Sequence, residues 1–180
     1  MFKSEETLTT IMLSTLLVAL ALGGCLVYII ASSGNKIYQR KQLQEHGYEI
    51  RDSIDQASDL QVAELLAEDV KQHIHYNYNI TDPGTYNLKK KILFDDSAYK
   101  IYFNNSSGIC TDFCEIYSLL LQGAGLNAKY IDRIKTPAGT EHAYVDISID
   151  DKQYRIDITS YCTAALHNAD TSFETYITEV

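Results

Sequence analysis

Hydrophobic residues follow two different patterns, one near the start of the chain and one beyond residue 58. From Ile11 to Ala31 they form a run of twenty-one residues without a charge. A helix of that length spans the ~30 Å of hydrocarbon in a bilayer, whereas core helices of soluble proteins are usually shorter and carry a polar face. The run therefore predicts a transmembrane segment at residues 11–31, preceded by an N-terminal tail at residues 1–10.

The same run contains Leu22-Gly23-Gly24-Cys25, which is similar to a bacterial lipoprotein cleavage site. In that alternative, Cys25 would be lipidated and the preceding residues removed. However, the apolar run continues to Ala31, and Glu5 and Glu6 stand where a signal peptide carries positive charge. We therefore expect a single-pass, uncleaved N-terminal anchor, with the lipoprotein as the alternative.

Polar sequence connects this anchor to the rest of the chain. Lys36, Arg40 and Lys41 follow the apolar run and only Lys3 precedes it, a small excess that favours a cytoplasmic domain but leaves the side of the membrane open. Residues 32–57 have few apolar positions and predict a stalk or a short juxtamembrane helix. The folded domain is then expected at residues 58–180.

Within this domain, two segments have helical periodicity. Apolar residues recur every three or four positions from Asp59 to His75. From Cys110 to Gln122 they form one stripe, with glycines following at 123 and 125. Such glycines commonly end a helix. Each segment therefore predicts an amphipathic helix with one buried face.

Three strand-like runs follow the second helix, at Lys129–Ile134, His142–Ile149 and Gln153–Ile158. A turn centred on residues 150 and 151 would pair Val145 with Ile156 and place an apolar pair at each inward step. The same register puts His142 opposite Thr159. Asp157 is then its diagonal neighbour, roughly 7–8 Å away along the backbone.

Composition excludes several classes of protein. The formal charge of −9 argues against a nucleic-acid partner, which requires a basic face. Four cysteines at irregular spacings form neither a disulfide framework nor a zinc motif. We therefore expect no cofactor and no metal. One alternative remains open, a metal site built from Cys110, Cys114, His142 and Cys162, which metal analysis would reveal.

Cys110 lies where a polar loop becomes a helix. The first N–H groups of a helix and its dipole favour thiolate over thiol. With His142 as base and Asp157 accepting its Nδ1–H, these are the parts of a cysteine nucleophile. A lone cysteine is more often a small buried hydrophobe, and we read Cys114 that way.

Three blocks of sequence, taken together, resemble the transglutaminase-like superfamily. The nucleophile block is G-I-C-T-D-F-C-E at 108–115, the histidine block H-A-Y-V-D-I at 142–147, and the aspartate block R-I-D-I-T at 155–159. V-K-Q-H-I-H-Y-N-Y at 70–78 is similar to the segment that precedes that core. Tyr144 replaces the usual tryptophan and Ile158 the usual proline.

The resemblance implies an α+β, papain-like core in which the cysteine helix packs on an antiparallel sheet. It also implies acyl transfer from amide bonds of a protein or peptide substrate, with Cys110, His142 and Asp157 as the catalytic residues. Water as acceptor would give a peptidase or amidase, which we favour, and a lysine would give a cross-link. A catalytically idle domain that serves as a binding module is the alternative.

Overall fold

The computed structural model describes residues 2–80, 85–86, 97–136 and 139–180. Its helices are α1 (Phe2–Asp52), α2 (Asp59–His73), α4 (Ser97–Phe103), α5 (Cys110–Gly123) and α6 (Ile158–Thr163), with 3₁₀ turns η1 (Ala164–His167) and η2 (Phe173–Tyr176). Its strands are β1 (His75–Tyr76), β2 (Ser107–Gly108), β3 (Asn127–Lys135), β4 (Glu141–Ile149), β5 (Lys152–Ile156) and β6 (Ile177–Glu179). The two predicted helices are α2 and α5.

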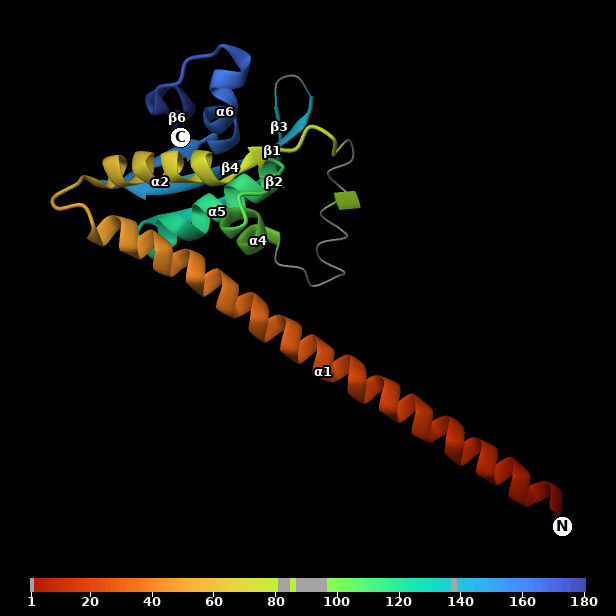
Figure 1. Cartoon of the computed structure of the whole chain (residues 1–180). Coiled ribbons are helices and arrows are strands. Elements are labelled where there is room, and N and C mark those ends of the chain that lie inside the picture. The colour runs from red at the N-terminus through yellow and green to blue at the C-terminus, as the bar shows by residue number, and fades with distance from the viewer. Residues whose placement is uncertain (1, 81–84, 87–96, 137–138) are drawn as a thin grey trace.

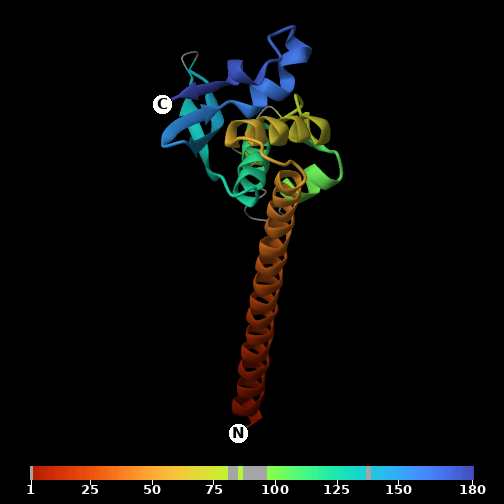
Figure 2. The same cartoon turned by 90° about the vertical axis from the view of Figure 1, so that its left-hand side faces the viewer.

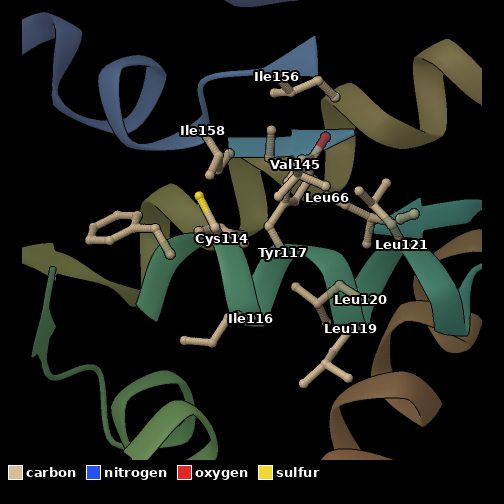
Figure 3. Close-up of a cluster of buried hydrophobic side chains, with 14 of the residues drawn as sticks. Leu66, Cys114, Ile116, Tyr117, Leu119, Leu120, Leu121, Val145, Ile156 and Ile158 are labelled. Atoms are coloured by element: carbon tan, nitrogen blue, oxygen red, sulfur yellow. The ribbon is translucent and has the colours of Figure 1, made fainter. Parts of the chain in front are cut away.

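A four-stranded antiparallel sheet, in the order β3-β4-β5-β6, forms one layer of the fold. Helix α5 packs on β3 and β4. The core lies between them, where Cys114 and Tyr117 of α5 point towards Val145 and Ile156 of the sheet (Figure 3). The predicted α+β fold, with the cysteine-bearing helix on an antiparallel sheet, is confirmed.

The β4–β5 hairpin has the predicted register. Val145 pairs with Ile156 and Ile147 with Tyr154. Asp150 and Asp151 at the turn have φ angles of 50° and 63°, the sign that a two-residue type I′ hairpin turn requires. This alignment keeps the apolar residues of both strands on the face that meets α5.

One part of the predicted hairpin is wrong. β5 ends at Ile156, two residues before the predicted end, so His142 has no strand partner at Thr159. The chain leaves the sheet because Asp157 is the N-cap of α6 and its side chain accepts a hydrogen bond from the Ser160 N–H. A capped helix start satisfies backbone donors that an extended strand would otherwise pair.

Helix α1 is continuous from Phe2 to Asp52, so the predicted tail, anchor and stalk form one element (Figures 1 and 2). Its last turns pack on α5, and Leu43 is fully buried there. A Cβ on Gly47 would lie 2.0 Å from the Leu120 carbonyl oxygen, so the two backbones are in direct contact. The packed part of the chain therefore starts before residue 58.

The apolar part of α1 projects away from the packed core (Figure 2). Val18, Leu22 and Val27 are exposed along it. Among the described residues, α1 is the one helix that is long and apolar enough to cross a membrane, judged by length and composition.

Candidate active site

Cys110 is the first residue of α5 and is partly exposed. A short parallel pairing places it there, because Tyr76 of β1 lies opposite Gly108 of β2. Ile109 is extended, with φ −113° and ψ 178°, and the helix begins immediately after it. The Ile109 N–H donates to the Asp112 carboxylate at 2.8 Å, so a side chain of the first turn holds the backbone that presents the thiol.

Gly108 is required by this turn. A Cβ at its position would lie 2.8 Å from the Asp112 Cβ and 3.0 Å from its Oδ2. Asp112 is fully buried and bonds back to Ile109, so it has little room to give way. This close approach explains physically why glycine stands two residues before Cys110.

His142 and Asp157 lie side by side, as predicted. His142 Nε2 is 2.9 Å from Asp157 Oδ1. The prediction that Nδ1 makes this bond is wrong. Asp157 is held by α6, where it accepts from the Ser160 N–H at 3.0 Å and from the Ser160 hydroxyl at 2.8 Å. From this position it meets Nε2, and the His142 side chain also hydrogen-bonds with Cys110.

The electrostatics of this cluster favour a charged imidazole. Hydrogen bonds with Asp157 and then with Cys110 outweigh burial and raise the pKa of His142 to about 10. Burial alone would raise the pKa of Asp157, but its hydrogen bonds with His142 and Ser160 hold it below the ordinary value. The imidazole of His142 therefore lies between the Asp157 carboxylate and the Cys110 side chain, and its raised pKa favours the imidazolium, which is the charge partner that an activated cysteine requires.

The other cysteines of the domain have a different environment. Cys114 lies one turn after Cys110, is fully buried and points into the core (Figure 3). Burial raises the pKa of Cys114 well above that of an ordinary thiol, and burial also raises the pKa of Cys162. Burial thus favours the neutral thiol at Cys114 and Cys162. Cys110 differs from them because it hydrogen-bonds with His142. All four cysteines are free.

Two tyrosines border the cluster. The rings of Tyr144 and His142 meet edge to face, with centroids 5.0 Å apart. Burial, and then the charge of the nearby Cys110, raise the pKa of Tyr76. Sequence reasoning gave no role to Tyr76, although it falls in the block at 70–78 that precedes the core. Only the β1–β2 pairing brings it next to Gly108.

Asp146 shares the outer face of β4 with His142 but has another partner. Its two carboxylate oxygens accept from Nε and Nη2 of Arg155, each at 2.8 Å. The Arg155 guanidinium also lies over the Tyr144 ring, 5.7 Å from the centroid. Asp146 is thus occupied by a neighbouring ion pair and does not orient the imidazole.

A hollow of about 480 Å³ adjoins the carboxylate side of the cluster. Tyr144 and Asp157 line it, together with hydroxyl groups from Thr136, Ser160 and Tyr176. These side chains offer hydrogen-bond donors and acceptors beside the reactive groups.

The alternative metal site, built from Cys110, Cys114, His142 and Cys162, is not found among the residues that the structure describes. Within the described part of the chain, no group of three or more His, Cys, Asp or Glu side chains is arranged to hold a metal ion.

A family model described as the transglutaminase-like superfamily matches residues 49–157. No curated protein sequence matches the chain. Among solved structures, a TGase is similar over 68% of this chain and 32% of its own, with 18% identity and a TM-score of 0.49. The periplasmic domain of TgpA from Pseudomonas aeruginosa is similar over 75% of this chain and 47% of its own, with 17% identity and a TM-score of 0.49. This chain spans less than half the length of either.

Proposed function

The chain belongs to the transglutaminase-like superfamily, and from this premise we propose that it is a membrane-anchored cysteine acyl-transfer enzyme acting on amide bonds of proteins or peptides. Cys110 is its nucleophile, His142 the acid and base, and Asp157 the residue that orients His142. The contact of His142 with both Asp157 and Cys110 is the observation that supports this most strongly.

In the first half of the reaction, the Cys110 thiolate attacks the amide carbonyl carbon. The backbone N–H of Cys110 has no helical partner, so it is free to donate to the developing oxyanion. The tetrahedral intermediate collapses as imidazolium His142 gives its proton to the leaving nitrogen. Ammonia or an amine departs and a thioester on Cys110 remains.

In the second half, His142 is neutral and removes a proton from the incoming acceptor. Attack by the acceptor on the thioester releases the acyl group and restores the thiolate and the imidazolium. Transfer to an amine requires that water be kept out of the site. The side chains of His142 and Asp157 keep 20% and 24% of their surface exposed, which favours water as acceptor and hence hydrolysis over cross-linking.

The proposed anchor is the apolar part of α1. A helix in lipid satisfies its backbone hydrogen bonds internally, and the exposed apolar side chains of residues 18–29 then meet hydrocarbon instead of water. In this arrangement, α1 connects the bilayer to the packed domain without a flexible linker.

The proposed chemistry can be tested by measuring hydrolysis of a 4-nitrophenyl ester, a generic acyl donor, by the full-length protein in detergent. Cys110→Ala should abolish turnover, whereas Cys114→Ala should retain it, because Cys114 only fills space in the core. Addition of a primary amine should divert only a minor part of the acyl group if hydrolysis dominates. Turnover that survives Cys110→Ala would refute Cys110 as the nucleophile, and absence of turnover in the wild-type protein would favour the idle binding module.

A further inference from the structure

Helices α1 and α5 run in the same general direction, and this determines which end of α5 lies nearer to the proposed anchor. Arg40 of α1 donates to Glu115 of α5 at 2.6 Å, and Arg51 donates to the carbonyl of Ala124 at 3.1 Å. Residue numbers therefore rise together along both helices. Cys110, five residues before Glu115, lies at the end of α5 that faces the apolar segment, as does the β1–β2 pair beside it (Figure 1).

The connection between the two is short and rigid. The chain is helical throughout from Ala31 to Arg40, and the nine steps between these two residues correspond to about 13 Å along the axis. Beyond them, α1 is fixed to the domain by the buried Leu43 and by direct backbone contact at Gly47 and Gly123. The packed domain is therefore held at a fixed distance from the proposed anchor.

From this geometry we infer that the acyl donor is a polypeptide held at the same membrane and attacked in the stretch of chain close to the bilayer surface. The inference rests on the proposed acyl-transfer function and on α1 as anchor. A rigid mount confines the thiol to one layer above the lipid, and a donor confined to the same layer has a high effective concentration there. A donor amide held far from the bilayer gains nothing.

Side chains along the connecting helix fit the same placement. Lys36, Tyr38 and Lys41 are exposed on the turns of α1 that follow the apolar run. Lysine and tyrosine are the residues that settle at the headgroup level of a bilayer. They would hold α1 at a defined depth, and with it the height of Cys110.

The test uses full-length protein in lipid nanodiscs and a lipid-anchored acyl donor. The donor carries a 4-nitrophenyl ester at the end of a polyproline spacer, which extends ~3.1 Å per residue, and a series of spacer lengths is compared with the same donor lacking the lipid. We expect anchored donors to react at least about tenfold faster than the free donor, since tethering can give gains of up to about 10²–10⁴. The rate should have an optimum at a short spacer.

An insertion provides the matched control. Seven helix-forming residues between Asn35 and Lys36 add about 10 Å and nearly two whole turns, so the domain rises and keeps its facing. The optimum should move to a spacer longer by about three prolines. A Gly/Ser insertion of the same length should broaden the optimum, because it makes the mount flexible.

The outcomes separate the inference from the function on which it rests. Equal rates for anchored and free donors, or an optimum that ignores the insertion, would overturn the inference while turnover of the free ester upholds the acyl-transfer chemistry. Absence of turnover with every donor, in wild-type protein, would overturn the proposed function and the inference with it.

Discussion

Asp157 makes two kinds of contact in this chain, with His142 and with the start of α6, and the sequence pattern predicted only the first. The hairpin pattern placed it beside His142, because apolar pairs in β4 and β5 fix the register. The pattern did not reveal that Asp157 also caps α6. A cap depends on where the chain leaves the sheet, and alternation of apolar residues continues past that point to Ile158. The ring nitrogen that meets Asp157 was mispredicted for the same reason.

Asp157→Asn separates the effects of these two contacts. Asparagine is as good an N-cap as aspartate, so α6 should persist and the melting temperature should change little. Asparagine cannot stabilise imidazolium and favours the wrong tautomer of His142, so turnover of the 4-nitrophenyl ester should fall about 10²–10⁴-fold. Steady-state rates and thermal melts of the same preparation measure both effects.

Asp146→Asn is the matched control. Its carboxylate bonds to Arg155 on the same face of the hairpin, and the side chains of that pair keep 22% and 32% of their surface exposed. Loss of such a pair costs at most about 1 kcal/mol of stability, and turnover should stay within a factor of about three of wild type. A fully active Asp157→Asn protein would contradict the proposed role of Asp157. An inactive Asp146→Asn protein would show that Asp146, and not Asp157, is the carboxylate required for turnover.

At the scale of elements, the contact between α1 and α5 was the feature that the sequence concealed. Residues 32–57 read as polar because the interface uses few apolar side chains. Instead of apolar side chains, the interface uses close approach of the two backbones at Gly47 and Gly123. At each of these positions an added Cβ would lie within 2.0 Å of a carbonyl oxygen of the other helix. Glycine has no hydrophobic signature, so periodicity cannot detect a crossing of this kind.

Two truncations test that contact. Removal of residues 1–31 should give a soluble, folded domain, because the turns of α1 that pack on α5 remain. Removal of residues 1–57 should lower the melting temperature strongly or leave the protein unfolded, because α5 loses the cover of Leu43 and the hydrogen bonds from Arg40 and Arg51. Circular dichroism and size exclusion compare the two fragments.

A pair of point variants refines this prediction. Leu43 is fully buried, whereas Ile37 on the same helix is 70% exposed. Leu43→Ala should cost about 2–5 kcal/mol, and Ile37→Ala should cost little. If the shorter fragment melts at the same temperature as the longer one, the packing of α1 does not contribute to the fold.

At the scale of the whole molecule, local patterns predicted the parts and the structure supplied their placement. The helix at Cys110, the three strands and the apolar run at residues 11–31 all have strong periodicity or length signals. Neither the continuity of α1 through residues 32–52 nor its shared direction with α5 leaves such a signal. Both set where the candidate site lies relative to the apolar segment of α1, so the inference about the acyl donor depends on the structure and not on the sequence pattern.

The central claim is that Cys110 is an activated thiolate, and alkylation of the full-length protein by iodoacetamide tests it most directly. An ordinary thiol with a pKa of about 8.5 is almost wholly protonated at pH 6 and unreactive. Because the pKa of His142 is raised to about 10, its imidazolium persists as the pH rises from 6 to 8 and is lost only near the upper value. Labelling of Cys110 should therefore be fast at pH 6 and nearly constant up to pH 8.

Peptide mapping of one sample compares the three cysteines of the packed domain under identical conditions. The account predicts that Cys110 is labelled well before Cys114 and Cys162, whose thiols burial keeps neutral. It also predicts that His142→Gln removes this selectivity. Two results together would contradict the claim. Cys110 would be labelled no faster than Cys162 at pH 6, and its labelling rate would rise tenfold per pH unit, as for a free thiol.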